Sequence, residues 1–325
     1  MLGAGFSKGA DFPLVNEFEF FFQRHKNGLL RRFNKDRLRD FERVLNYDRN
    51  VEEAFKIIEG KGDLEELKLL KQAVTWILVA CCENYQSHSP NLLGYQNFLT
   101  LVKNQKANLI TLNQDTVLEI TLYINSLRKD DDGFNIDRID YGVVGWEKYS
   151  PIEICGEKSK KYFNFVDIPY LKLHGAINFH FCPDHRWSYL ADMTNNTYSD
   201  RCPTIVSGKP CGKIMEPEII PPRRIKETAL FRELWTQAEE VLAASNVITC
   251  IGLNLNEGDE DFLSLLNEGL HKGDKELGFI NFSPDKSIQE KFHWKEKIKN
   301  LLNFDIPLEN ISLDGFVEWI SQMEN

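Results

Sequence analysis

The chain has 325 residues, of which 42% are hydrophobic and 12% aromatic, and it carries a formal net charge of −10. This composition supplies a full hydrophobic core and excludes a disordered protein. The negative charge argues against direct nucleic-acid binding, because phosphate contacts need a basic surface. We expect one large domain with an elaboration, or two domains.

The sequence shows no sign of membrane insertion or export. The longest apolar run, AVTWILVACC at 73–82, is too short to cross a bilayer and is typical of a buried helix. The start MLGAG lacks the charged and apolar regions of a signal peptide. Seven cysteines at irregular spacings favour reduced thiols over a disulfide framework. These features predict a cytoplasmic protein that does not bind membranes.

The chain begins with MLGAGFSKG, a glycine-rich stretch with a small hydroxyl residue. Gly3 and Gly5 would allow a tight turn and a close approach to a pyrophosphate, with amide donors directed at the anion. A complete dinucleotide-binding pattern has a third glycine three positions after Gly5, where Lys8 stands instead. Taken alone, a flexible terminus explains this stretch equally well.

Residues 17–99 have a helical pattern, which is interrupted at Gly60–Gly62 and at Pro90. Apolar residues recur three and four positions apart, which indicates helices with one buried face each. Three such faces are Phe18 with Phe21 and Phe22, Phe41 with Val44 and Leu45, and Val51 with Ala54, Phe55 and Ile58. We therefore expect a helical insertion subdomain over 17–99.

From residue 107 onward, short apolar runs rich in β-branched residues alternate with helical stretches. The runs cover 107–112, 170–173, 247–253 and 277–282, and the helical stretches include 117–127, 231–244, 261–270 and 288–300. Continuous apolar runs are typical of strands buried on both faces of a parallel sheet. We predict an α/β fold, a Rossmann-like parallel sheet formed by 1–16 and 100–325 with the helical insertion after its first loop.

Polar residues follow these predicted strands at the edge where an open α/β sheet binds its ligand. They are Asn113 and Asp115, His174 next to Gly175, Gly252 with Asn254, and Asn281. Each has a plain structural explanation: Asn113 or Asp115 would cap the helix at 117–127, and His174 would be a hydrogen-bonded histidine at a strand end. Their common placement at one edge favours a shared site.

A cysteine-rich segment raises the question of zinc. Cys182, His185, Cys202 and Cys211 together would supply four tetrahedral ligands. The segment has no Cys-x-x-Cys pair, however, and structural zinc sites usually use such close pairs. We therefore favour three unrelated thiols and no metal, with zinc as the alternative.

Taken in order, LGAGFS, TLNQD, LKLHG, CIGLN and INFSP resemble the successive nucleotide-site motifs of the sirtuin-like superfamily. The resemblance spans nearly the whole chain apart from the helical insertion. GAGFSKG and KLHGAINF are most similar to the prokaryotic branch of NAD-hydrolysing antiphage effectors. Members usually have a short apolar run before the glycine loop, so we expect the recorded start to lie downstream of the natural one and the central strand to be missing.

The resemblance implies a role for each candidate residue. Asn113 would place the catalytic water or the ribose, Asp115 would lie near the nicotinamide amide, and His174 would be the catalytic base. The phosphates would be contacted by Ala4, Gly5 and Ser7. The adenosine would be contacted by Gly252, Asn254 and Asn281.

The resemblance implies hydrolysis of NAD⁺ to nicotinamide and ADP-ribose, which would deplete NAD⁺ in an infected bacterial cell. An NAD-dependent protein deacylase is an alternative, but Pro13 stands where deacylases have the arginine of Asp-Phe-Arg, and residues 218–222 lack their Phe-Gly-Glu element. A non-catalytic module that binds NAD or ADP-ribose is the other alternative. The implied partners are NAD⁺, further copies of this chain in a homo-oligomer, and a HerA-like hexameric ATPase.

Overall fold

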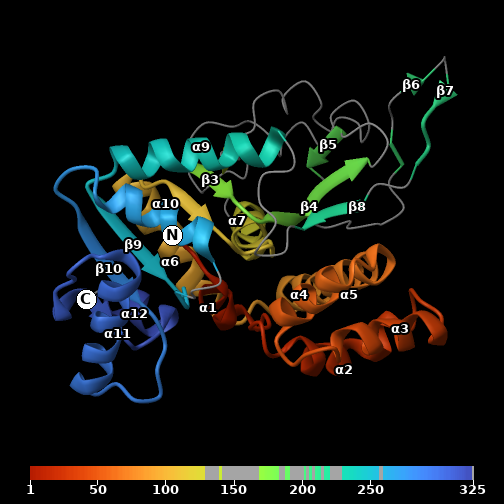
Figure 1. The fold of residues 1–325 in the computed structure, drawn as a ribbon, viewed down its shortest axis with the longest axis horizontal. Helices are drawn as coiled ribbons and strands as arrows, with labels where there is room; N and C mark the ends of the chain where they lie inside the picture. The colour runs from red at the N-terminus through yellow and green to blue at the C-terminus, as the bar shows by residue number, and fades with distance from the viewer. Residues whose placement is uncertain are drawn as a thin grey trace.

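The structure is a computed structural model that describes residues 1–128, 139–140, 168–182, 187–190, 201–202, 205–206, 209–213, 216–219, 229–255 and 259–323. Figure 1 shows a part built around parallel strands, and beside it a group of helices formed by α2 to α5. Buried hydrophobic side chains from both parts belong to one continuous cluster.

The main sheet is parallel and has two halves. Its strands are β1 (Leu109–Thr111), β2 (Ile139–Asp140), β3 (Ile168–Lys172), β9 (Val247–Ile251), β10 (Glu276–Ile280) and β11 (Ile311–Ser312). In one half, β3 lies between β1 and β2; in the other, β10 lies between β9 and β11. The four apolar runs of the sequence all lie in this sheet, which confirms the predicted α/β class.

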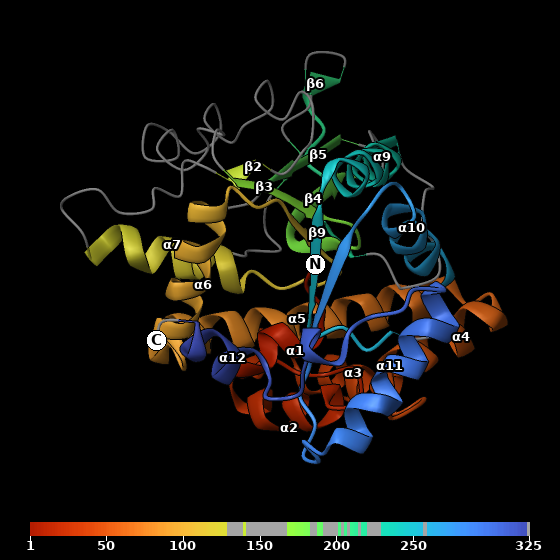
Figure 2. The same cartoon turned by 90° about the vertical axis from the view of Figure 1, so that its left-hand side faces the viewer.

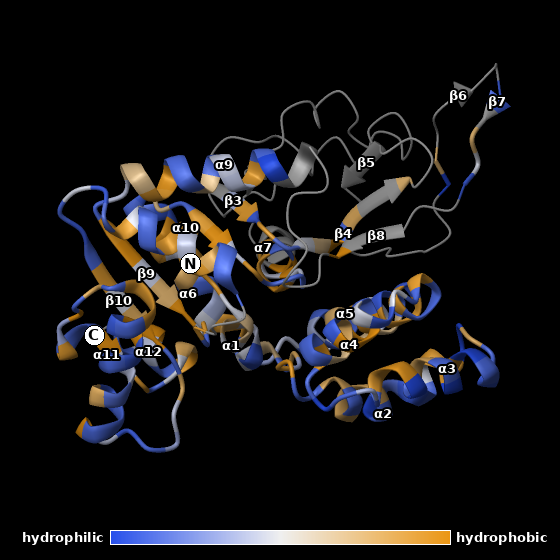
Figure 3. Ribbon diagram, in the orientation of Figure 1, coloured by the Kyte–Doolittle hydropathy of each residue, from blue (hydrophilic) through white to orange (hydrophobic). Residues whose placement is uncertain are grey.

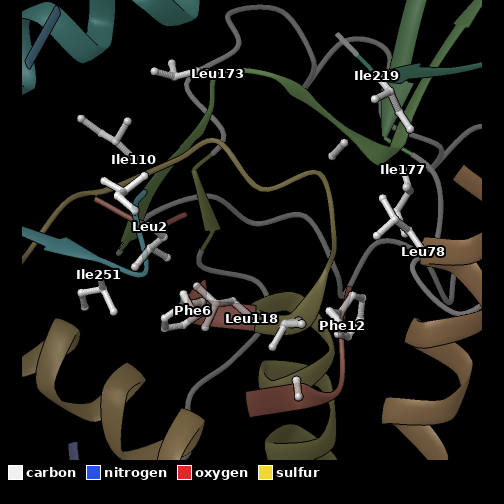
Figure 4. Close-up of a cluster of buried hydrophobic side chains, with 14 of the residues drawn as sticks. Leu2, Phe6, Phe12, Leu78, Ile110, Leu118, Leu173, Ile177, Ile219 and Ile251 are labelled. Atoms are coloured by element: carbon white, nitrogen blue, oxygen red, sulfur yellow. The ribbon is translucent and has the colours of Figure 1, made fainter. Parts of the chain in front are cut away.

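Leu2 joins the two halves and occupies the central position. It forms parallel bridges to Thr111 on one side and to Ile251 on the other. The Leu2 N–H donates to the Ile110 carbonyl at 2.8 Å, and the Gly3 N–H donates to the Ile251 carbonyl at 2.9 Å. Figure 4 shows the Leu2 side chain between Ile110 and Ile251. The expected gap in the centre of the sheet is therefore not found, because Met1 to Gly3 fill it.

The resulting order is β2, β3, β1, Leu2, β9, β10, β11. With Leu2 counted as the first strand and β2 as an additional edge strand, this is the 3-2-1-4-5-6 order of doubly wound nucleotide-binding sheets. The order reverses between Leu2 and β9. In such sheets the ligand binds at the carboxyl ends of the strands beside this reversal.

Helices cover both faces of the sheet. They are α6 (Leu92–Gln105), α7 (Val117–Arg128), α9 (Ala229–Ala244), α10 (Glu260–Leu270), α11 (Ile288–Leu302) and α12 (Phe316–Gln322). Figure 2 shows α9 and α10 on one side of β9, and α6, α7 and α12 on the other. In Figure 3 the strand β9 is mostly hydrophobic, whereas α9 has alternating polar and apolar patches. This difference is what buried strands and half-exposed helices require.

The second group contains α2 (Phe18–Leu29), α3 (Lys35–Leu45), α4 (Val51–Lys61) and α5 (Leu64–His88). The long helix α5 packs against the other three. Its middle is the apolar run at 73–82, which is buried there as predicted, apart from Ala80, which is partly exposed. The side chains of Asn34, Asn50 and Asp63 cap the starts of α3, α4 and α5 by accepting hydrogen bonds from backbone N–H groups.

A smaller antiparallel sheet, which the sequence patterns did not indicate, lies beside α5. It consists of β5 (Trp187–Leu190), β4 (Gly175–Cys182) and β8 (Glu216–Ile219), in that order, and a separate pair joins β6 (Ile205–Val206) to β7 (Lys209–Pro210). Figure 4 shows Ile177 of β4 and Ile219 of β8 near Leu78 of α5. Among the described residues, no helix meets the length and hydrophobicity needed to span a membrane.

Candidate functional site at the carboxyl edge of the sheet

The glycine loop and the segment after β9 are in direct backbone contact at the point where the strand order reverses. The loop continues into a single helical turn, α1 (Ala4–Ser7), and the Gly5 N–H donates to the Gly252 carbonyl at 3.0 Å. Gly252 has φ +66°, and a Cβ there would lie 2.1 Å from the backbone nitrogen of Phe6. A Cβ on Gly5 would lie 2.9 Å from the Gly252 Cα. Both glycines are therefore required by this packing, independently of any phosphate.

Asn113 fixes the glycine loop to the end of β1. Its Nδ2 donates to the Gly3 carbonyl at 3.0 Å and to the Ser7 hydroxyl at 2.9 Å. Its backbone N–H donates to the Thr111 hydroxyl at 2.9 Å. Asn113 and Ser7 are both buried. The Ser7 hydroxyl, predicted to contact a phosphate, is thus bonded to a predicted catalytic residue in this structure.

Asp115 extends the same network and also caps a helix. Its Oδ1 accepts from the Val117 N–H at 3.1 Å, at the start of α7, so the capping explanation is correct for Asp115. Its side chain is also hydrogen-bonded to Ser7. Burial raises the pKa of Asp115, and the nearby Lys172 ammonium and the Ser7 hydrogen bond oppose that rise.

A fully buried ion pair between Lys172 and Glu119 lies next to Asp115. The Lys172 Nζ, at the end of β3, lies 2.6 Å from the Glu119 Oε1 of α7 and donates to the Asp115 carbonyl at 2.5 Å. Burial raises the pKa of Glu119, and Lys172 opposes the rise. We did not single out either residue in the sequence. The available signal was a lysine within the apolar run YLKL, since a lysine inside a buried strand needs a buried acidic partner.

His174 lies in the turn between β3 and β4, and β3 pairs with the strand that leads to Asn113. The last register pair of β1 and β3 is Thr111 with Lys172, and Asn113 and His174 are each the second residue beyond it. The Leu173 N–H donates to the Thr111 carbonyl at 2.9 Å, so the two segments stay together past the strands. Burial lowers the pKa of His174 to about 4, which makes the imidazole neutral at pH 7. Its Nε2 has no hydrogen-bond partner in the part of the chain that the structure describes.

Of the predicted adenosine contacts, Asn281 lies at the edge between β9 and β10, and Asn254 is directed to the surface. The Asn281 Nδ2 donates to the Leu253 carbonyl at 3.2 Å, and its Oδ1 accepts from the Phe282 N–H at 2.9 Å. The Asn254 Oδ1 accepts from the Lys297 Nζ of α11 at 3.0 Å, and Asn254 is exposed. The structure thus brings Asn113, Ser7, Asp115 and the glycine segments together and gives Asn254 a separate, exposed partner.

Three cysteines that we interpreted as unrelated come together in the structure. The sulfur atoms of Cys182, Cys202 and Cys211 all lie within 4.8 Å of one another. Backbone hydrogen bonds join the segments of Cys202 and Cys211, because the Cys202 N–H donates to the Lys213 carbonyl at 2.8 Å and the Gly212 N–H donates to the Cys202 carbonyl at 3.2 Å. Three thiolates fit a structural zinc ion, which would cross-link the segment without entering the chemistry. The fourth candidate ligand, His185, lies outside the described residues.

Comparison with models of protein families and with curated proteins finds no match to this chain. Among solved structures it is similar to a mutant Sir2 homologue in complex with ADP-ribose, with 14% identity and a TM-score of 0.45 over 99% of this chain and 91% of that one. It is also similar to a Sir2 enzyme described for its mechanism and regulation, with 13% identity and a TM-score of 0.42 over 99% and 88% of the two chains. A third similar structure is Sir2Tm bound to a propionylated peptide, with 11% identity and a TM-score of 0.40 over 99% and 89%. Likeness at this level says nothing of the activity of this chain.

Proposed function

We propose that this chain hydrolyses NAD⁺ at the bond between nicotinamide and ribose. One observation carries the proposal: Asn113, Ser7 and Asp115 form a hydrogen-bonded network, and His174 lies in the turn that follows the adjacent strand β3. All four lie at the carboxyl edge of a doubly wound sheet, near the reversal of strand order where such sheets bind nucleotides. A binding module would not need a neutral, buried histidine beside this network.

The reaction requires a nucleophile and stabilisation of positive charge. The bond from the ribose C1′ to the pyridine nitrogen breaks with its electron pair on nitrogen, so nicotinamide leaves as a neutral molecule and needs no acid. The ribose develops oxocarbenium character, as in glycoside hydrolysis. Water then adds to C1′ and loses one proton, and the products are nicotinamide, ADP-ribose and a proton.

The side chains at the edge fit these requirements. A neutral His174 accepts the proton of the water, or polarises a ribose hydroxyl, and general-base catalysis of this kind contributes roughly 10²–10⁴-fold. The Asn113 amide hydrogens are bonded to Gly3 and Ser7, which leaves its Oδ1 to accept from the water or the ribose. The carboxylate of Asp115 orients the carboxamide of nicotinamide.

The ADP half of the substrate would extend over the glycine loop and the ends of β9 and β10. Backbone amides at Ala4 and Gly5 would bind phosphates, and Gly252 and Asn281 would adjoin the adenosine. In this structure the Gly5 N–H is bonded to Gly252, and Asn281 is bonded to Leu253. Binding therefore requires these groups to share or exchange their present partners.

The biological part of the proposal rests on the resemblance of the sequence motifs. We propose a cytoplasmic effector that depletes NAD⁺ during phage infection, and assembly with further copies of this chain or with a HerA-like ATPase would switch it on. Activity that rises with protein concentration, or upon addition of the ATPase, would support this form of control.

The test is release of nicotinamide from NAD⁺ by the purified chain, alone over a range of concentrations and together with the ATPase. We expect His174→Ala and Asn113→Ala to lower the rate by roughly 10²-fold or more. His271→Ala is the matched control, because His271 is exposed and bonded to the Asn267 carbonyl of its own helix. Equal rates in all four proteins would contradict the assignment, and deacylation of an acylated peptide would identify the alternative activity.

A further inference from the structure

Asn178 has a buried side-chain amide that makes no hydrogen bond within the described part of the chain. It is 0% exposed, and both its Nδ2 and its Oδ1 lack partners among the described residues. Within that part of the chain it is the one buried side chain in which a donor and an acceptor are both unpaired. Each buried polar atom left unpaired is costly, so an apolar side chain of the same size would suit the unliganded fold better. A ligand that supplies both missing bonds explains why an amide stands here.

The strand that carries Asn178 is bonded to the segment of the proposed catalytic residues. It lies in β4 where the register with β8 shifts, between Ala176 and His180. Such irregularities redirect side chains and are frequent beside active sites. The preceding residue, Ile177, donates its N–H at 2.9 Å to the carbonyl of Gln114, the residue between Asn113 and Asp115.

The unpaired atoms define the chemistry of the ligand. A primary amide offers one carbonyl acceptor and an NH₂ donor. Its complement is a second carboxamide, which would donate to the Asn178 Oδ1 and accept from the Nδ2 in a paired arrangement. A carboxylate has acceptors only and would be repelled by the Oδ1. The second hydrogen of the ligand NH₂ would remain for the Asp115 carboxylate.

We propose that Asn178 binds the carboxamide of nicotinamide and makes the site select NAD⁺ over nicotinic acid adenine dinucleotide. This inference rests on the proposed hydrolysis of NAD⁺ and adds to it the residue that reads the leaving group. The two dinucleotides differ only at this group, and Asp115 is the same in the wild type and the Asn178 variants, so a change of preference between these proteins isolates the Asn178 contact.

The experiment compares kcat/KM for the two dinucleotides in the wild type, Asn178→Leu and Asn178→Asp. We expect the wild type to prefer NAD⁺ by at least about tenfold, and Asn178→Leu to lose most of that preference. Asn178→Asp should reject the nicotinic acid form even more strongly, because two carboxylates would meet. Binding of ADP-ribose should be equal in all three, and Asn178→Leu should unfold at an equal or higher temperature than the wild type.

An unchanged preference in both variants would overturn the assignment, and if Asn178→Leu does not fold, the result with Asn178→Asp decides. A wild type that binds ADP-ribose but releases no nicotinamide would instead contradict the proposed hydrolysis. In that case, binding of free nicotinamide against nicotinic acid to the wild type and to Asn178→Leu still tests Asn178. Equal discrimination by both proteins would then overturn it.

Discussion

The helical group α2–α5 and the carboxyl edge of the main sheet differ in whether their ion pairs are exposed or buried. In the helical group, ion pairs such as Lys26 with Glu42 lie at 2.9 Å with each side chain about one-third exposed. At the sheet edge, Lys172 and Glu119 are completely buried at 2.6 Å, and Asp115 is buried next to them. Exposed pairs contribute little to stability, whereas buried charges are tolerated only when each is paired.

Under the proposed function, this difference marks the region where stability would be given up for catalysis. The helical group needs nothing from its charges beyond solubility and a few caps. The sheet edge holds a neutral histidine and an acid with a raised pKa, and the adjoining strand β4 carries Asn178, whose side chain has no partner among the described residues; each is less favourable than an apolar residue would be. Groups of this kind gather at functional sites.

Removing one member of the buried pair should give the largest effect on stability. Lys172→Met leaves the Glu119 carboxylate buried without its ammonium partner and removes the donor to the Asp115 carbonyl. We expect a loss of about 3–5 kcal/mol in the free energy of unfolding. Urea denaturation measures it.

Lys26→Met is the control for an exposed pair, with an expected loss of at most about 1 kcal/mol. The double variant of Lys172→Met with Glu119→Leu should recover part of the stability, because Glu119 is then no longer a buried carboxylate without an ammonium, although Asp115 still loses the nearby Lys172. Equal losses for Lys172→Met and Lys26→Met would refute the contrast between the two regions.

Gly252→Ala should give the next largest effect. The new Cβ would lie 2.1 Å from the Phe6 nitrogen, and Gly252 has φ +66°, so the substitution combines a backbone clash with a strained conformation. We expect a loss of about 2–3 kcal/mol, measured by urea denaturation, together with weaker binding of ADP-ribose.

Gly273→Ala separates the effect of a strained backbone conformation from the effect of a steric clash. Gly273 has φ +96°, but a Cβ there would meet nothing within 4 Å. Strain alone should cost about 1 kcal/mol, without a change in ADP-ribose binding. Similar losses of stability in the two variants would show that the close contact between Gly252 and the glycine loop adds nothing to the cost of the positive φ.

The sequence predicted the elements with strong local patterns and missed those that depend on distant partners. The run at 73–82 and the runs that became β9 and β10 were apolar enough to be recognised without a structure. Leu2 could not be recognised as the central strand, because a single residue has no periodicity and its bridges reach residues 111 and 251. The antiparallel sheet around β4 was missed because its outer strands β5 and β8 are short and the register between β4 and β8 is irregular.

In the candidate site, too, residues marked by a local pattern could be predicted, and residues that depend on distant partners could not. Asn113, Asp115 and His174 could be predicted as site residues because each follows a recognisable strand and the fold class places strand ends at one edge. The Lys172–Glu119 pair was missed because its members are 53 positions apart and nothing local marks Glu119 as a buried residue. Asn178 could not be predicted either, because only the structure shows that its buried side chain has no hydrogen-bond partner among the described residues.

His174 provides the smallest and most specific test of the sheet edge. Its pKa is about 4 in the folded chain and would be near 6.5 in the unfolded one, so between these values the unfolded chain takes up a proton that the folded chain does not. The free energy of unfolding therefore falls as the pH falls through this window. Asp115 and Glu119, whose raised pKa values act in the opposite direction, are present in both the wild type and His174→Gln and cancel in the comparison.

From pH 7 to 5.5, the wild type should lose about 1 kcal/mol more than His174→Gln in the free energy of unfolding. Urea denaturation at the two pH values measures this difference. His271→Gln is the control, because it removes an exposed histidine and should leave the wild-type dependence on pH nearly unchanged. If His174→Gln kept that dependence as well, the imidazole would be protonated normally in the folded chain. It would then be a cation at mildly acidic pH, next to a substrate ring that is itself positively charged, and could not serve there as the proposed base.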